Sequence, residues 1–181
     1  DRIASRGVRF TNHNTPCPIC SPSRATMLTG RYPRNHRLVV NGMALDPQLP
    51  TLPGQLAAAG YRTHGIGKHH LQPILAPPEY TMPESTAFWK EPMAKEWHGP
   101  YYGFQNVAFV IGEADHAATG GGHYAQWLSG HHPHALPLLA REKALEPPPG
   151  DLNEIWKSAI PPELHYNTWI TDQATDVIDN S

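Results

Sequence analysis

A cysteine and an arginine lie four residues apart at the start of a predicted helix. Cys20 directly precedes Ser21–Gly30, a stretch with a capping serine, an early proline and a closing glycine, and this order predicts a short helix. The N–H groups at a helix N-terminus favour bound anions and the thiolate form of a cysteine. Arg24 carries a guanidinium suited to a tetrahedral oxyanion or to an acidic group. The spacing fits an anion-binding nucleophile, and it also fits a buried cysteine beside a capped helix with a solvated arginine.

A lysine and a histidine two residues apart form the second candidate group. Lys68 and His70 stand in the sequence Gly-Lys-His-His-Leu. On an extended segment, residues two apart share a face and can converge on one ligand. The alternatives are a surface lysine at a strand end and a solvated histidine.

The elements that would position these residues alternate between helix and strand. Thr51–Gly60 has a cap, an early proline, an apolar face and a terminal glycine, which predicts a second helix, and Tyr61–Gly67 predicts a short strand after it. This order is typical of an α/β domain, in which the C-terminal ends of the strands carry the chemistry.

The two ends of the chain carry weaker signals. We predict the end of a helix at Asp1–Gly7 and a short strand at Val8–Phe10. Near the C-terminus, Trp169 begins an apolar stripe at helical spacing, which predicts an amphipathic helix that is capped by Asn167 or Thr168 and packs on a sheet.

Composition excludes several classes of protein. The chain has 181 residues and a formal net charge of −2 with no block of Lys or Arg, which argues against a nucleic-acid partner or a polybasic membrane surface. No apolar run approaches the roughly 18 residues of a membrane span. Two cysteines are too few for a disulfide-stapled domain. The 20 Pro and 15 Gly suit a loop-rich globular domain, and we expect irregular excursions over 72–149, with short helices such as Tyr124–Ser129.

Together these motifs resemble the type I sulfatases. Cys20–Arg24, followed by Leu28–Arg31, resembles the Cys-x-Pro-x-Arg signature of that family. Gly60–Thr63, Gly67–Leu71 and Thr171–Ala174 extend the match in the same order. The departures are Met27 in a variable position and His69 where tryptophan is common.

The resemblance implies an α/β, alkaline-phosphatase-like sandwich whose central, mostly parallel sheet is flanked by helices. It also implies that a maturation enzyme oxidises Cys20 to formylglycine (3-oxoalanine), whose hydrated aldehyde is the nucleophile. By the same resemblance, Arg24 would hold the formylglycine, Lys68 would neutralise the sulfate oxygens, and His70 would lie near the leaving or attacking oxygen.

Members of the family also hold a divalent cation, Ca²⁺ or Mg²⁺, with acidic ligands near the formylglycine oxygens. From this chain only Cys20, as formylglycine, would bind it, because the acidic pairs are expected before Asp1 and beyond Ser181. Asp179-Asn180 is interpreted as a helix end. We therefore expect residues 1–181 to be a partial catalytic domain, truncated at both ends and inactive alone.

The expected activity is hydrolysis of a sulfate ester on a small molecule or glycan. A phosphonate or phosphate ester hydrolase of the same superfamily is the nearest alternative. An alternative of another class is a small zinc or redox module built on Cys17 and Cys20, with His13 and His36 nearby. The sequence determines neither the alcohol part of the substrate nor the oligomeric state, and a secreted or periplasmic location is favoured over a cytoplasmic one.

Three further motifs have structural interpretations. His131–His134 is interpreted as a solvated loop, and His165 as a packing or capping residue. Gly120–Gly122 lacks the following helix and lysine of a phosphate loop, so we expect a flexible turn there.

Overall fold

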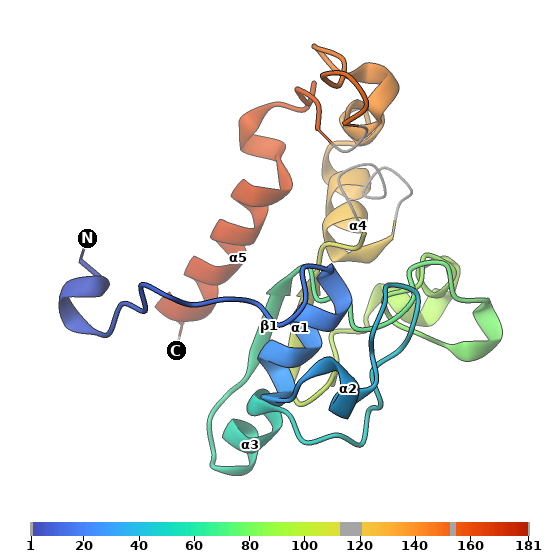
Figure 1. The fold of residues 1–181 in the computed structure, drawn as a ribbon. Coiled ribbons are helices and arrows are strands. Elements are labelled where there is room, and N and C mark those ends of the chain that lie inside the picture. Colours follow the sequence, from blue (N-terminus) through green and yellow to red (C-terminus); the bar gives the residue numbers. More distant parts are fainter. Residues whose placement is uncertain (1, 113–120, 153–154, 181) are drawn as a thin grey trace.

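A computed structural model describes residues 2–112, 121–152 and 155–180, and it has a mixed α/β architecture (Figure 1). The α-helices and strands, in chain order, are α1 (Cys20–Thr29), α2 (Pro33–His36), α3 (Leu52–Ala58), β1 (His64–Gly67), β2 (Asn106–Phe109), α4 (Gly122–His131) and α5 (Tyr166–Asp179). Short 3₁₀ turns lie at Ala4–Arg6, Pro78–Tyr80, Phe88–Lys90, Pro92–Lys95, Leu136–Leu139, Arg141–Lys143 and Pro162–Leu164.

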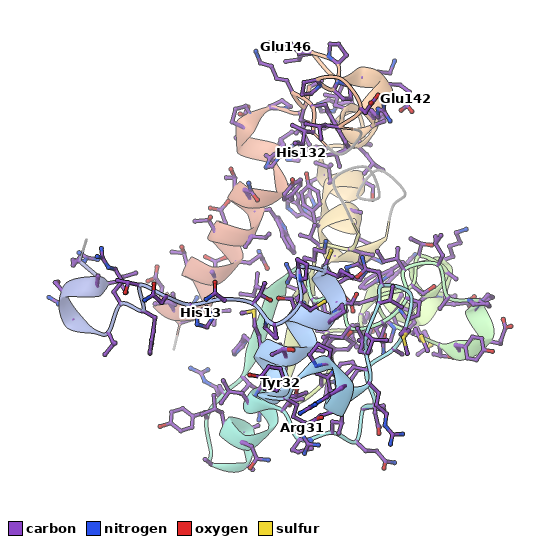
Figure 2. All side chains as sticks on the ribbon, in the orientation of Figure 1. His13, Arg31, Tyr32, His132, Glu142 and Glu146 are labelled. Carbon is purple, nitrogen blue, oxygen red and sulfur yellow. The ribbon has the colours of Figure 1, made fainter. Side chains whose placement is uncertain are left out.

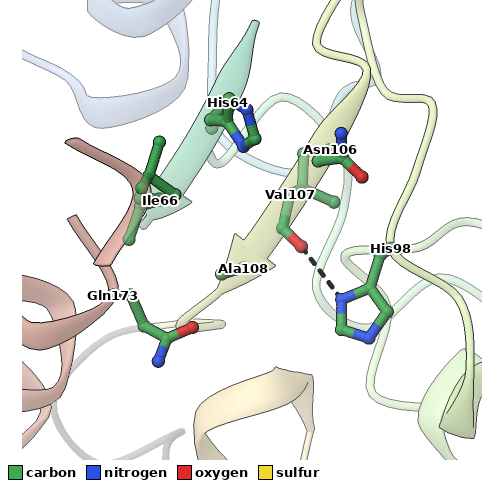
Figure 3. A pocket seen from close by; sticks show the side chains of 9 residues that line it. His64, Ile66, His98, Asn106, Val107, Ala108 and Gln173 are labelled. Carbon is green, nitrogen blue, oxygen red and sulfur yellow. Dashed lines mark hydrogen bonds between the residues drawn. The ribbon is translucent and has the colours of Figure 1, made fainter. Parts of the chain in front are cut away.

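The two strands pair in parallel, with His64 opposite Asn106 and Gly67 opposite Phe109. On one face of the sheet Val107 and Phe109 are buried in a core that also contains Ala25 of α1. The other face carries His64 and Ile66 toward α5 (Figure 3). The parallel pairing and the helices around it confirm the predicted α/β class.

The core consists of two clusters that meet along β2. The first packs Leu38, Leu71 and Tyr101 around Phe109, and the second packs Val110 and residues of α4 against Trp169 of α5. Burying a side chain of this size contributes about 1.5–3 kcal/mol. Strand β2 and the residue after it therefore contribute to both clusters.

Helix α1 begins one residue earlier than predicted. Its N-cap is Ile19, in an extended conformation and without a side-chain cap, so Cys20 is the first helical residue. Ser21 is therefore not the cap; it is buried, and its Oγ has no hydrogen-bond partner among the described residues. The helix closes as predicted at Gly30, which has φ +66°. The predicted cap of α3 is also confirmed, since the Thr51 hydroxyl accepts the Gly54 N–H.

Helix α5 packs on the sheet as predicted, but its predicted cap is wrong. The cap is His165, whose Nδ1 accepts the Asn167 N–H at 3.2 Å, while the Thr168 hydroxyl donates to the Pro162 carbonyl. His165 thus has the capping role that its context allowed. The helix ends at Asp179 with Asn180 as its C-cap, which confirms a helix end there.

The predicted strand at Val8–Phe10 is wrong. These residues have no regular secondary structure, and Val8 and Phe10 are 79% and 76% exposed. Residues 2–19 run outward from the body of the molecule (Figure 1). Residues that favour β structure form a strand only where a neighbouring strand pairs with their backbone, and the described residues place none beside them. The expected helix end at Asp1–Gly7 is a 3₁₀ turn, Ala4–Arg6.

The stretch 72–149 contains regular structure that the sequence pattern did not reveal. Strand β2 lies within it, and the helix predicted at Tyr124–Ser129 is the longer α4. Gly121 is the N-cap of that helix, so the expectation that no helix follows the glycines was wrong; Gly120 lies outside the described residues.

Candidate functional site

The structure joins the two segments that carry the candidate residues. Cys20 and Arg24 lie in the first turns of α1, and Lys68 and His70 follow the C-terminal end of β1 directly. The Arg24 guanidinium donates to the Lys68 carbonyl, with Nη1 and O 2.5 Å apart. The arginine therefore links the helix of the cysteine to the turn of the lysine and histidine.

The side chain of Asn41 supports the N-terminus of α1. Its Oδ1 accepts the Ser21 N–H at 3.0 Å, and its Nδ2 donates to the Cys20 Sγ at 3.7 Å. One amide thus satisfies an N–H of the first helical turn, which has no partner within a helix, and also contacts the half-buried thiol. The sequence analysis missed Asn41, although the Asn-Gly pair that it forms with Gly42 is a turn signal.

A buried carboxylate holds the turn after β1, which we call the Lys68–Gln72 turn. The Glu84 side chain accepts the backbone N–H groups of His70, Leu71 and Gln72, the last two at 2.5 and 3.0 Å. The Tyr101 hydroxyl donates to the same carboxylate at 2.6 Å. Burial raises the pKa of Glu84, and these hydrogen bonds oppose that shift. The sequence analysis missed Glu84, since a single glutamate in an irregular stretch carries no local signal.

His69 occupies an aromatic pocket behind that turn. Its ring centroid lies 5.8, 5.2 and 5.0 Å from those of Tyr101, Phe104 and Phe109. The pKa of His69 is lowered to about 4, mainly by burial; a hydrogen bond to Gly67 opposes this shift, and the charge of Arg24 adds to it. A neutral, planar ring therefore fills this place, which explains how His69 can replace the tryptophan that the family resemblance leads us to expect.

The zinc-module alternative finds no support in the geometry. Cys17 and Cys20 are not joined by a disulfide, and the ring nitrogens of His36 face the Thr26 hydroxyl and the Leu38 N–H. His13 lies on the outward-running N-terminal segment, remote from His132 (Figure 2). Over residues 2–112, 121–152 and 155–180, no three His, Cys, Asp or Glu side chains gather as metal ligands.

The same finding bears on the cation that the family resemblance implies. A Ca²⁺ ion takes about six to eight oxygen ligands, many of them carboxylates. The side chain of Asn41, which contacts the Cys20 thiol, is a neutral amide. The described residues therefore do not by themselves fit a calcium or magnesium site.

Two other features lie apart from the candidate residues. A cavity of about 220 Å³ between the sheet and α5 is lined by His64, Ile66, Ala108 and Gln173, among others (Figure 3). The histidine tract at the end of α4 is exposed at His131 and His134 and half-buried at His132, and the His131 Nδ1 lies 3.0 Å from the Trp127 carbonyl oxygen, as expected of a surface segment. No helix within the described ranges is long and apolar enough to cross a bilayer.

Comparison with known proteins identifies the family. The family model named Sulfatase matches residues 1–102, which include Cys20, Arg24, Lys68 and His70. The chain belongs to the sulfatase family.

Curated relatives are similar to parts of this sulfatase-family chain. Steryl-sulfatase of Mus musculus is 39% identical over 82 residues, covering 39% of this chain and 13% of that protein. The multifunctional alkaline phosphatase superfamily protein PehA of Trinickia caryophylli is 45% identical over 67 residues, covering 37% and 13%. N-acetylglucosamine-6-O-sulfatase of Bacteroides thetaiotaomicron is 32% identical over 102 residues, covering 56% and 17%. The chain thus spans less than a fifth of the length of these relatives.

A solved structure confirms the fold. Phosphonate monoester hydrolase of Agrobacterium radiobacter matches with a TM-score of 0.63 at 22% identity, over 100% of this chain and 32% of that chain. The chain therefore has the alkaline-phosphatase-like α/β fold expected from its motifs.

Proposed function

We propose that residues 1–181 carry the nucleophile and the sulfate-binding turn of a sulfuric ester hydrolase. The observation that carries this proposal is the hydrogen bond from Arg24 to the Lys68 carbonyl. It brings α1, which begins at Cys20, to the turn that holds Lys68 and His70, all within the family match. An anion at this point would meet a helix N-terminus together with two cationic side chains.

Each residue has a distinct part in the proposed reaction. Cys20, converted to formylglycine by a maturation enzyme and hydrated to a gem-diol, attacks sulfur with one hydroxyl and displaces the alcohol. The second hydroxyl then loses its proton and re-forms the carbonyl, which breaks the C–O bond to sulfate. Lys68 neutralises the sulfate oxygens, and His70 donates a proton to the leaving alcohol. Arg24 orients the nucleophile and, through the Lys68 carbonyl, the turn.

We further propose that the catalytic unit is larger than residues 1–181. The relatives that match this chain are several times longer, and the described residues do not complete a cation site. In this proposal the acidic ligands of Ca²⁺ or Mg²⁺ come from chain outside residues 1–181, so these residues alone do not turn over substrate.

The substrate is proposed to be a sulfated small molecule or glycan. The relatives are named for steryl, N-acetylglucosamine and choline sulfates, and all of them match this chain. The matched residues therefore carry what these enzymes share, which is handling of the sulfate group. Other parts of the protein would select the alcohol.

Hydrolysis of a phosphonate or phosphate ester is the second candidate. The match of the entire chain to a phosphonate monoester hydrolase and the 45% identity to PehA favour it. Rates of the complete gene product on 4-nitrophenyl sulfate and 4-nitrophenyl phenylphosphonate separate the two. A higher kcat/KM for the phosphonate than for the sulfate would show that phosphonate hydrolysis, and not sulfate hydrolysis, is the main activity.

The nucleophile is tested by converting Cys20 to Ala in the complete gene product, expressed with a formylglycine-generating enzyme. We expect a hydrazide probe to label position 20 in the wild type, and the variant to lose the label and at least about 10³-fold in kcat. Cys17→Ala is the matched control and should keep both the hydrazide label at position 20 and the wild-type kcat. A near-normal rate in Cys20→Ala would overturn the proposed function.

A further inference from the structure

The carboxylate of Glu84 lies at the centre of a network that surrounds the Lys68–Gln72 turn. We propose that Glu84 is a positioning residue, which sets the backbone of this turn and thereby places His70 at the oxygen of the leaving alcohol. This inference rests on the proposed function and adds to it a residue that lies outside the recognised motifs.

The geometry of the bonds carries the first step. Three consecutive N–H groups, those of His70, Leu71 and Gln72, converge on the two oxygens of Glu84. Such convergence requires a tight turn, and His70 accordingly has φ +56°, in the left-handed region. That conformation costs a non-glycine residue about 1–3 kcal/mol. Charge-assisted hydrogen bonds of about 1.5–3 kcal/mol each can offset it.

The second step is that Glu84 is itself held in place. Its backbone N–H donates to the Gln72 side chain at 3.4 Å, and Tyr101 binds its carboxylate. The residues that follow are also tied down, because the Ser85 hydroxyl donates to the Ala76 carbonyl and the Thr86 N–H to the Ile74 carbonyl. Because these bonds hold Glu84 and the residues after it, its carboxylate can determine the backbone conformation of the Lys68–Gln72 turn.

The third step is that the turn is held on its carbonyl side as well. Arg24 donates to the Lys68 carbonyl, and the Leu45 N–H donates to the Leu71 carbonyl at 2.8 Å. Glu84 holds the N–H side. The backbone of the turn is therefore clamped between two charged groups of opposite sign, one of which the sulfatase motif contains and one of which it does not.

Both oxygens of Glu84 are occupied by hydrogen bonds from the protein. Neither oxygen is left for the substrate, so the effect of Glu84 on the reaction passes through His70. A proton donor matters most when the leaving alcohol is a poor leaving group. Misplacement of His70 should therefore slow a substrate with a poor leaving group more than one with a good leaving group.

The test compares Glu84→Gln with wild type on two substrates, 4-nitrophenyl sulfate and phenyl sulfate, in the complete gene product. Glutamine keeps the size but puts an NH₂ group against N–H donors. We expect kcat on phenyl sulfate to fall about 10- to 100-fold and kcat on 4-nitrophenyl sulfate to fall less than about threefold. His70→Ala should give the same pattern, and the double variant should be no worse than His70→Ala. Glu79→Gln, at an exposed glutamate nearby, is the control without effect.

The proposal would be overturned if Glu84→Gln lowered kcat equally on both substrates, in proportion to the folded fraction. It would also be overturned if the variant lowered kcat on neither substrate. If Glu84→Gln does not fold, Glu84→Asp takes its place, since it keeps the charge and shortens the reach. It should then show a smaller loss confined to phenyl sulfate, and an unchanged ratio of the two rates would overturn the proposal. Failure of the proposed function gives a different result, because the wild type would then lack the aldehyde at position 20 and hydrolyse neither sulfate. In that case the inference about Glu84 would also be wrong.

Discussion

The two halves of the candidate site are held by different means. The N-terminus of α1 places Cys20 by helix geometry, with the side chain of Asn41 in support. The Lys68–Gln72 turn instead depends on a buried carboxylate from residue 84 and a tyrosine from residue 101. A helix end exposes its N–H groups in a fixed direction through its own hydrogen bonds, whereas a left-handed turn needs partners from elsewhere in the chain.

This difference explains where the molecule should tolerate change. Near Cys20, a substitution alters the chemistry more than the fold. Near Lys68, a substitution in the supporting segments alters the fold first and the chemistry through it. Three predictions test this contrast, in addition to those for Cys20 and Glu84.

The largest effect on folding is expected at Gly103, in the segment that supports the turn. A Cβ there would lie 2.3 Å from the Gly54 nitrogen, and Gly103 has φ +90°. Gly103→Ala should lower the free energy of unfolding by about 3 kcal/mol or more, because backbone must move. Gly42 also has φ +90° but has nothing within 4 Å of a Cβ. Gly42→Ala should therefore cost only about 1–2 kcal/mol of conformational strain. Equal losses in urea unfolding would show that the close approach is unimportant.

A smaller effect is expected when the link between the two halves is weakened. Arg24→Lys removes the forked guanidinium that reaches the Lys68 carbonyl. We expect kcat/KM to fall about 10²-fold from misplacement of the turn. Arg34→Lys, at an exposed arginine, should change neither rate nor stability. A rate for Arg24→Lys equal to that of the control would mean that the two halves are positioned independently.

The third expected effect is a pH dependence of stability that arises behind the turn. Burial lowers the pKa values of His69 and His123 to about 4 from 6.5. Both are neutral in the folded protein, so their contribution to stability is complete above pH 6.5 and is lost as pH falls toward 4. Each should remove about 1.4 kcal/mol per pH unit over that range.

The measurement is the midpoint of urea unfolding between pH 7 and pH 4.5. His69→Phe keeps a ring in the aromatic pocket and removes one proton-binding site, so its stability should fall less steeply than that of the wild type. His13→Phe, at an exposed position, should leave the slope unchanged. If the stability of His69→Phe fell with pH as steeply as that of the wild type, the lowered pKa of His69 would be contradicted.

Local patterns were sufficient for the elements that contain their own signals. Gly30 closes α1, Thr51 caps α3, and an apolar stripe predicts α5. The motif residues also identified the family and thereby the fold. The starts of α1 and α5 were predicted wrongly, because α1 begins after Ile19 without a side-chain cap and His165 caps α5 in place of Asn167 or Thr168.

Tertiary structure decided the remaining features. Val8–Phe10 has β-forming residues but no partner strand among the described residues, whereas Asn106–Phe109 becomes a strand because β1 lies beside it. Asn41 reaches Cys20 from 21 residues away, and Glu84 reaches His70 from 14. The sequence by itself determined which residues could do the chemistry and the helices near them, because those signals are local. Pairing of strands and burial of a carboxylate depend on segments that meet only after folding, and no local pattern records such meetings.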